Sequence, residues 1–165
     1  MRGRGDEEGK LTSLRVAFVD VYVLRGRADT LEALLLRRAR GRARGGSWEG
    51  VHGKIEPGEK PVAAALRELF EETACRPLAL YNLSRVEHFY LHQSDETVMI
   101  PAFVAFVALD AVIHLGDEHD MSLWLTLPGA AERCSWPRAS RALEDAVRLL
   151  GQGSAGLLED TLRVG

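Results

Sequence analysis

Arg67 stands among four glutamates whose spacing suggests metal chemistry, namely Glu59, Glu68, Glu71 and Glu72. Glu68, Glu71 and Glu72 come directly after Arg67, in a stretch whose apolar residues recur at helical spacing. On a helix, residues three and four apart share a face, so these three carboxylates would converge. Like charges at this spacing repel by roughly 0.2–0.5 kcal/mol per pair in water, and by more when partly buried. A bound divalent cation would compensate for that repulsion.

The residue types restrict the kind of ion. Hard carboxylate oxygens with no His or Cys among them favour Mg²⁺, for which Mn²⁺ can substitute, over zinc. Arg67 lies on another face of the predicted helix, and the turn "EPGE" would fold the preceding loop back so that Glu59 pairs with it. A solvated acidic face is the commoner explanation of a run of charges. The full spacing pattern therefore has to decide between the two interpretations.

That spacing resembles the Nudix box, G-x5-E-x7-R-E-U-x-E-E-x-G-U, in which U is an aliphatic residue. The matching residues are Gly53, Glu59, Arg67, Glu68, Leu69, Glu71 and Glu72. Ala74 stands where the family has its second glycine, and Cys75 takes the last aliphatic position. A glycine there would end the helix in a left-handed turn, and alanine in that conformation would cost about 1 kcal/mol. The departure concerns the helix end and none of the implied ligands.

A second resemblance lies downstream, at 118–125. The sequence "EHDMSLWL" is similar to the E-H-x4-W-L segment of the Nudix branch that contains dihydroneopterin triphosphate pyrophosphatases and diadenosine polyphosphate hydrolases. In that branch the glutamate reaches the metal site from a loop, which implies this role for Glu118. We expect His114 and His119 to be structural or solvated, because a neutral imidazole is an unusual partner for Mg²⁺. Trp124 is expected in the core, where it holds the Glu118 loop.

The resemblance implies an α/β (α+β) fold, namely an α/β/α sandwich with a mixed central sheet. It also implies hydrolysis of a phosphoanhydride bond in a nucleoside diphosphate derivative. The implied metal ligands are Gly53, through its carbonyl, and Glu68, Glu71, Glu72 and Glu118. The catalytic set is Glu71, Glu72 and Glu118. The general base is left open between Glu71 and Glu118, with a slight preference for Glu118, while Glu59 and Arg67 have a structural role.

Substrate identity is less constrained. The segment 85–107 resembles the substrate-side hairpin of triphosphate-cleaving members, so we expect a nucleoside or pterin triphosphate that is cleaved to a monophosphate and pyrophosphate. The alternatives are a dinucleoside polyphosphate, then ADP-ribose, and last a ligand-sensing Nudix module without turnover. The candidate substrate-binding residues are Arg37, Arg38, Trp48, Lys54 and Phe89. Tyr22, Tyr90 and Trp136 are further aromatic candidates for a platform that stacks on a base.

The composition fits one domain: the chain has 165 residues, of which 46% are hydrophobic and 27% charged. The net charge of −3 gives no general attraction for nucleic acid, and no apolar stretch is long enough to span a bilayer. We therefore expect a cytoplasmic protein that binds a nucleotide-like small molecule, with no membrane or specific nucleic-acid partner and with a homodimer as one option. The Arg-rich segment 37–44 is either solvated or a positive rim for a polyphosphate.

Local patterns predict the elements that position these residues. We expect a disordered lead-in over 1–13, the Nudix domain over 14–151 and a flexible tail over 152–165. Helices are predicted over 61–73 and 136–151. The predicted strands are 14–24, 31–38, 81–92, 97–109, 111–115 and 122–127, with a short extended segment over 47–53. In the first helix, the expected buried stripe is Ala65, Leu66, Leu69 and Phe70.

Overall fold

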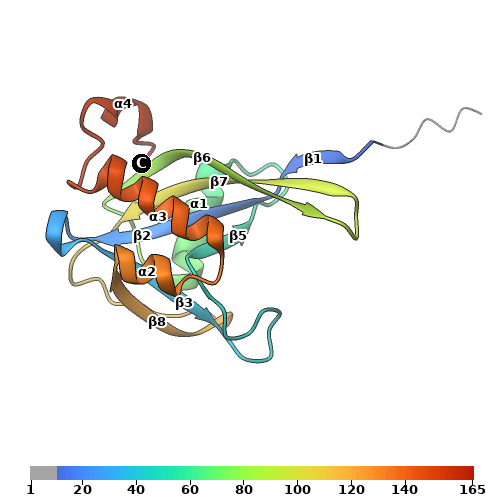
Figure 1. Cartoon of the computed structure of the whole chain (residues 1–165), viewed down its shortest axis with the longest axis horizontal. Coiled ribbons are helices and arrows are strands. Elements are labelled where there is room, and N and C mark those ends of the chain that lie inside the picture. The colour runs from blue at the N-terminus through green and yellow to red at the C-terminus, as the bar shows by residue number, and fades with distance from the viewer. Residues whose placement is uncertain (1–10) are drawn as a thin grey trace, which may run out of the picture.

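The computed structural model describes residues 11–165, which form an eight-stranded mixed sheet covered by helices (Figure 1). The strands are β1 (Ser13–Val16), β2 (Phe18–Arg25), β3 (Glu32–Arg38), β4 (Trp48–Glu49), β5 (Val51–Lys54), β6 (Ala79–Leu91), β7 (Glu96–Phe106) and β8 (His119–Thr126). The α-helices are α1 (Pro61–Thr73), α2 (Leu127–Arg133), α3 (Pro137–Leu150) and α4 (Glu159–Leu162). Two short 3-10 turns cover Ala28–Thr30 and Gly156–Leu158. The expected lead-in falls largely outside the described residues, although Ser13 already begins β1.

Strand β7 holds the sheet together because it pairs with three other strands. It runs parallel to β1 and β2 and antiparallel to β6. Strand β2 also pairs antiparallel with β3 and β5, and β3 pairs antiparallel with β4 and β8. The sheet is therefore mixed, as the sequence predicted, and the β6–β7 hairpin and β1 project from one side of the molecule (Figure 1).

The two faces of the sheet carry separate cores because side chains alternate along each strand. On β2, Val19, Val21 and Val23 pack with Leu69 of α1 on one face. The intervening Tyr22 and Leu24, together with the apolar side of α3, pack on the other face. Figure 1 shows α3 and α2 on one side of the sheet and α1 behind it. The predicted α/β/α sandwich is thus confirmed, with α1 and α3 on opposite faces of the sheet.

Three local expectations were wrong. The apolar run 111–115 is not a strand, because its residues pack against α1 from a loop instead of pairing with the sheet. Helix α2 was missed, since its seven residues are too few to show helical periodicity. In α1, Leu66 and Phe70 are partly exposed, and Ala64 and Glu72 join the buried face in their place.

The end of the chain docks on the sheet, although a flexible tail was expected over 152–165. The backbone of Gly165 accepts a hydrogen bond from Leu80, and Val164 donates one back to the Leu80 carbonyl. Leu162 of α4 is buried in the same core as α3, and Glu159 accepts a hydrogen bond from the hydroxyl group of Tyr81 at 2.9 Å. These contacts to β6 are long-range, which is why local composition did not indicate them.

Candidate active site

Helix α1 presents its glutamates because its ends are fixed by local chemistry. Pro61 stands at its first turn, where the missing N–H leaves no bond unmade. At the other end Ala74 adopts φ 58° and ψ 11°, and its N–H bonds to the carbonyl of Phe70 at 2.8 Å. The left-handed turn expected at this position is therefore present with alanine. Between these ends, the side chain of Glu68 extends toward β5, and the backbone of Glu72 contacts the loop before β8.

Arg67 connects the box loop to the helix. Its Nε and Nη2 groups donate to the two oxygens of Glu59 at 3.0 and 2.8 Å, and Nη2 also donates to the Lys54 carbonyl at 2.8 Å. The hydrogen bonds from Arg67 lower the pKa of Glu59 to about 2. Nη1 reaches Glu68 at 2.7 Å and Glu71 at 3.2 Å. The predicted Glu59–Arg67 pair is thus formed, and the same guanidinium offsets part of the repulsion between the other carboxylates.

Glu68 lies directly over Gly53 of β5. A Cβ atom at position 53 would be 1.8 Å from the Glu68 Cδ, so only glycine leaves room for this carboxylate. The side chain of Glu68 is 12% exposed. Burial raises its pKa, and the charges of Glu71 and Glu118 add to this effect, whereas Arg67 opposes it. The close approach brings the Gly53 backbone and the Glu68 carboxylate together, as expected for two ligands of one ion.

Glu72 is the most deeply buried carboxylate of the group. Its residue is 6% exposed, and its Oε2 atom has no hydrogen-bond partner. Burial raises its pKa well above the ordinary value, and repulsion from Glu68, Glu49 and Glu118 raises it further. A buried, unpaired acceptor among like charges is unfavourable unless a cation or a proton joins it. This arrangement fits a divalent ion with oxygen ligands.

Glu118 arrives from the loop between β7 and β8, which is anchored on the end of α1. In this loop His114 donates to the Thr73 carbonyl at 3.0 Å and Gly116 to the Glu72 carbonyl at 3.3 Å. Glu118 Oε2 accepts a hydrogen bond from Arg38 Nη2 at 3.0 Å, while its side chain remains 51% exposed. The loop thus brings a glutamate that is 46 positions after Glu72 to the box carboxylates, as the downstream resemblance implied.

Arg38 pairs with the buried Glu49 and also reaches Glu118, so its position is fixed at the edge of the site. Arg38 Nη1 donates to Glu49 Oε1 at 3.0 Å, and both residues are buried. Burial raises the pKa of Glu49, but Arg38 and the nearby His119 ring lower it more, to about 2. His119 is buried 3.6 Å from Glu49 and 3.9 Å from Glu72, which agrees with its expected structural role. His114 is exposed, and Trp124 is half-buried beside the core.

The carboxylates satisfy the chemistry of a divalent-ion site but do not yet enclose one. In the part of the chain that the structure describes, no three Asp, Glu, His or Cys side chains converge as a closed ligand set. Arg67 holds Glu68 and Glu71, and Arg38 holds Glu118. A bound ion would coordinate these carboxylate oxygens in place of the arginines. The unpaired Oε2 of Glu72 and the glycine space under Glu68 are the observations that favour such an ion.

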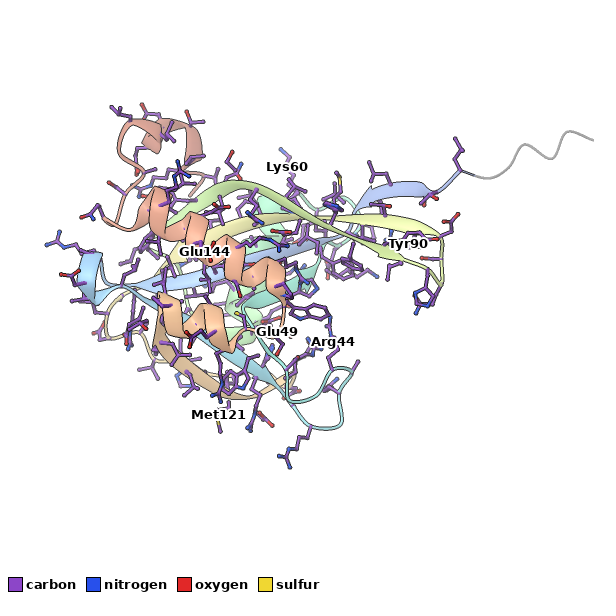
Figure 2. The ribbon with its side chains drawn as sticks, in the orientation of Figure 1. Arg44, Glu49, Lys60, Tyr90, Met121 and Glu144 are labelled. Carbon is purple, nitrogen blue, oxygen red and sulfur yellow. The ribbon has the colours of Figure 1, made fainter. Side chains whose placement is uncertain are left out.

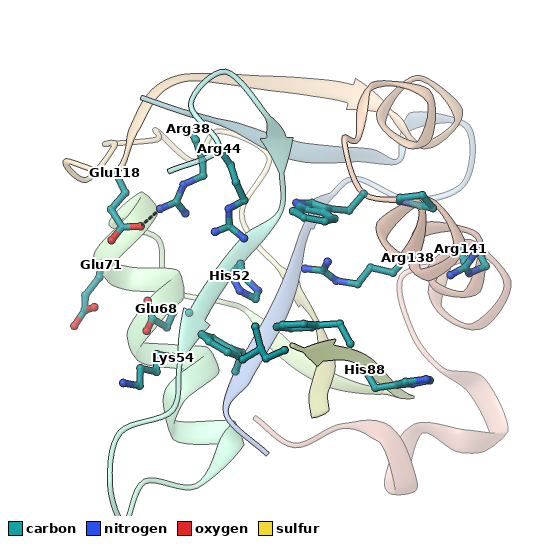
Figure 3. Close-up of a pocket in the computed structure, with 16 residues that line it drawn as sticks. Arg38, Arg44, His52, Lys54, Glu68, Glu71, His88, Glu118, Arg138 and Arg141 are labelled. Atoms are coloured by element: carbon teal, nitrogen blue, oxygen red, sulfur yellow. Dashed lines mark hydrogen bonds and ion pairs between the residues drawn. The ribbon is translucent and has the colours of Figure 1, made fainter. Parts of the chain in front are cut away.

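A pocket of about 800 Å³ opens beside these carboxylates (Figure 3). Glu68, Glu71 and Glu118 lie at one end, and Gly53 and Lys54 border it from β5. Among the predicted substrate-binding residues, Arg38, Lys54 and Phe89 line the pocket.

Two predicted substrate-binding residues do not line the pocket. Trp48 is 7% exposed and packs in the core under α3, so it serves the fold. Arg37 pairs with Asp120 at 2.7 Å on the outside of β3. Among the other aromatic candidates, Tyr22 is buried, and Tyr90 is exposed on the projecting hairpin (Figure 2) and does not line the pocket. Trp136 is the one of these three that borders the pocket.

Several lining residues were not predicted as site residues. They are Phe18, Arg44, His52, His88, Leu91, Pro137, Arg138 and Arg141. Arg44 belongs to the Arg-rich segment, for which a role toward a polyphosphate was one of two interpretations. Arg138 and Arg141 are three apart on α3, a spacing that places both on one face of the helix. That spacing was visible in the sequence, but nothing local indicated which face meets the pocket.

The comparisons with known proteins agree with this geometry. A family model of the NUDIX domain matches residues 14–146. The chain belongs to the Nudix family. Nudix proteins generally use divalent metal ions, which agrees with the carboxylates described above. In the described residues no helix is long and apolar enough to cross a membrane.

Two curated relatives show how far this Nudix similarity extends. An octanoyltransferase from Myxococcus xanthus is 38% identical over 117 residues, which is 70% of this chain but only 32% of that protein. The chain thus spans about a third of the length of this relative. The asymmetrical bis(5'-nucleosyl)-tetraphosphatase of Rattus norvegicus is 28% identical over 123 residues, or 73% of this Nudix chain and 82% of that protein.

Solved structures show the same Nudix fold. An Ap4A hydrolase from C. elegans has a TM-score of 0.67 at 21% identity, covering 81% of this chain and 96% of that one. The dihydroneopterin triphosphate pyrophosphohydrolase of E. coli has a TM-score of 0.59 at 24% identity, covering 79% and 94%. Both enzyme groups of the expected Nudix branch are therefore represented among the similar proteins.

Proposed function

We propose that this chain is a Mg²⁺-dependent hydrolase that cleaves a phosphoanhydride bond of a nucleotide-like substrate, with 14–151 as its catalytic domain. The observation that supports this most is the placement of Glu68, Glu71 and Glu118 at one end of the pocket, above the buried and unpaired Glu72. The first substrate class is a nucleoside or pterin triphosphate, cleaved to a monophosphate and pyrophosphate. Mn²⁺ can replace Mg²⁺, because both ions prefer oxygen ligands.

The ligands for the ion are the Gly53 carbonyl and the carboxylates of Glu68, Glu71, Glu72 and Glu118. Divalent ions held there would neutralise phosphate oxygens and assist a water in attacking phosphorus. Glu59 does not face the pocket, and its role is to fix Arg67 and thereby the box loop. Lys54 and Arg38 border the same end and supply positive charge to a polyphosphate chain.

The general base is the residue that must accept a proton from the attacking water. Glu118 and Glu71 are both exposed enough to do so, at 51% and 56% of their side chains. We propose Glu118, because Glu71 extends the helix face that already carries Glu68 and Glu72. Arg38 holds one oxygen of Glu118, and among residues 11–165 no group bonds to the second oxygen, which can accept the proton.

The comparisons favour a second candidate substrate. The rat relative is an asymmetrical bis(5'-nucleosyl)-tetraphosphatase, and the C. elegans protein is an Ap4A hydrolase. A dinucleoside tetraphosphate offers the same phosphoanhydride bonds to the carboxylate end of the pocket. Its products would be a nucleoside triphosphate and a monophosphate, which distinguishes it from the release of pyrophosphate.

A substrate panel tests the function directly. ATP, GTP, dihydroneopterin triphosphate and Ap4A are incubated with the protein and Mg²⁺, and the products are separated by anion exchange. We expect hydrolysis of at least one compound with Mg²⁺ or Mn²⁺ and none with EDTA. The products decide between pyrophosphate release and asymmetrical cleavage. If a folded protein hydrolyses nothing in the panel with either ion, the proposed function is wrong.

Variants of the two candidate bases test the mechanism. Glu118→Gln should lower kcat by a factor on the order of 10²–10⁴, because it keeps the shape of the side chain and removes the proton acceptor. Glu144→Gln, on the exposed side of α3 (Figure 2), is the matched control and should change little. If Glu118→Gln keeps most of its activity while Glu71→Gln loses nearly all, the base is Glu71.

A further inference from the structure

The pocket has a second charged end, opposite in sign to the first. Arg138 and Arg141 of α3 line it, and Figure 3 shows them across the pocket from Glu71 and Glu118. Arg44, from the loop between β3 and β4, lines the same pocket beside Arg38 (Figure 3). An apolar surface of Phe18, Phe89 and Trp136 lies in the same pocket. The carboxylates at one end suit cations and the phosphates that these cations bind. The arginines at the other end cannot bind a metal ion, so they need a different ligand.

Arg138 is the best-fixed residue of this basic end. Its Nε donates to Asp20 Oδ2 at 3.1 Å, and its Cζ lies 4.9 Å from the centre of the Trp136 ring. The side chain of Arg138 is 17% exposed. Within residues 11–165, its Nη1 and Nη2 groups have no hydrogen-bond partner. Asp20 thus holds the guanidinium through Nε, and Trp136 packs against its plane. Nη1 and Nη2, which can bind a phosphate together, are available to a ligand in the pocket.

Asp20 has no access to the substrate and positions the residues that do. It is 4% exposed on β2, and its two oxygens serve two pocket residues, because Oδ1 contacts His52 Nδ1 at 2.6 Å and Oδ2 accepts from Arg138. His52 in turn stacks on Phe18 with ring centres 5.1 Å apart. A buried carboxylate is retained only where partners satisfy it, and both of these partners face the pocket.

The positive charge at this end exceeds the negative charge that faces it. Arg44 lies 5.7 Å from the Trp136 ring centre and has no ion pair with another described residue. Arg141 is exposed and likewise has no carboxylate partner in the described part of the chain. Arg138 is in the first turn of α3, and no side chain caps that helix end, so the helix dipole adds to the positive potential. Of these three arginines, Arg138 pairs with the buried Asp20, and the charge of Arg44 lowers the pKa of the buried Glu49. An anion in the pocket would give this group of arginines a further partner.

We propose that Arg138, positioned by Asp20 and supported by Arg44 and Arg141, binds a phosphate group of the substrate that the carboxylate end does not hold. The inference rests on the proposed function for its substrate class, but it concerns binding and not the cleavage step. The phosphate belongs either to the far part of a polyphosphate chain or to the ribose of the nucleotide. The aromatic residues of the pocket accommodate the base between the two charged ends.

Binding to the metal-free protein isolates the basic end, because without cations the carboxylates repel phosphate. In EDTA, calorimetric titration compares AMP, ADP and adenosine 3′,5′-bisphosphate. ADP adds a phosphate to the chain, whereas adenosine 3′,5′-bisphosphate adds one to the ribose. We expect either ADP or adenosine 3′,5′-bisphosphate to bind roughly tenfold more tightly than AMP, in keeping with a charge-assisted pair. The one that does so identifies the source of the phosphate.

Variants show whether Arg138 causes that gain in affinity. Arg138→Gln should remove it, while Arg148→Gln, an exposed position of the same helix outside the pocket, should keep it. Asp20→Asn should also remove the gain. The gain is a ratio of affinities for two nucleotides on the same protein, and a variant that is only less stable would keep this ratio. The proposal is overturned if all three nucleotides bind the wild type equally, or if Arg138→Gln keeps the gain.

The outcome is separable from that of the proposed function. If the substrate panel shows no hydrolysis but the gain in affinity depends on Arg138, the pocket binds a bisphosphate without turning it over. If hydrolysis occurs and the gain is absent, the cleavage chemistry stands and the second phosphate site is wrong. With an active protein, Arg138→Gln should raise KM for the substrate that carries the extra phosphate and leave kcat within about twofold.

Discussion

At the scale of single residues, the site is organised by charges that the fold leaves incompletely compensated. Glu72 shows this most clearly, because it is buried, has an oxygen without a partner and lies among like charges. Because burial and these charges raise the pKa of Glu72 in the folded state, ionising it costs stability, and this cost grows as the pH rises through that pKa. A metal ion would remove the cost by pairing with the carboxylate.

Glu72→Gln is therefore expected to stabilise the metal-free protein and to abolish its response to metal. At pH 8 in EDTA the variant should melt at a higher temperature than the wild type, since glutamine keeps the shape and removes the buried charge. Adding Mn²⁺ should raise the melting temperature of the wild type but not of the variant. Thermal unfolding followed by circular dichroism measures both effects. Equal stabilisation of both proteins by Mn²⁺ would contradict the assigned role of Glu72.

Glu49 represents the opposite case, a buried carboxylate whose charge stabilises the fold. Its pKa of about 2 is below the ordinary 4.5, so its stabilisation is full above about pH 4.5 and is lost as the pH falls toward 2. Glu49→Gln should lower the free energy of unfolding by about 3 kcal/mol at pH 7, and the difference should shrink below pH 4.5. Urea unfolding at pH 7 and pH 3 tests this. A difference that is the same at both pH values would point to packing instead of charge.

At the scale of elements, helix α1 shows a local departure from the family pattern. Ala74 takes the left-handed conformation that glycine adopts without strain. Ala74→Gly should increase the free energy of unfolding by about 1 kcal/mol, which is roughly 2–4 °C in Tm for a chain of this size. Differential scanning calorimetry measures the shift. As a control, Ala63→Gly, at an exposed position inside the same helix, should lower Tm by a similar amount, because glycine is unfavourable within a helix.

The elements that the sequence predicted well are those with local signals. The bounds of α1 were found because Pro61 marks its start and the box spacing marks its end. Residues 111–115 looked like a strand because strands and buried loops can share the same apolar composition. The exposure of Leu66 and Phe70 was missed because two helical faces were similarly apolar, and contact with β2 and β5 decides which one is buried.

At the scale of the whole molecule, the pocket joins residues that are far apart in the sequence. Asp20 and Arg138 are separated by 118 positions, and Arg38 and Glu118 by 80. The box glutamates could be assigned from sequence because their spacing is local to one helix. The basic end could not, because it requires knowing that α3 packs across β2. Trp48 was misassigned for the same reason, since its bonds to Ser135 place it under α3.

The docked end of the chain is a further feature that only the whole molecule shows, and it leads to a stability prediction. Leu162 is 5% exposed and packs in the core that includes α3, although α4 has only four residues. Leu162→Ala should lower the free energy of unfolding by about 2–3 kcal/mol, because it leaves a cavity in that core. Leu157→Ala is the matched control, since Leu157 is fully exposed in the same segment and should change the stability by less than about 0.5 kcal/mol. Urea unfolding of both variants makes the comparison. If both have wild-type stability, residues 152–165 contribute nothing to the fold in solution and the flexible tail expected from the sequence is the better description.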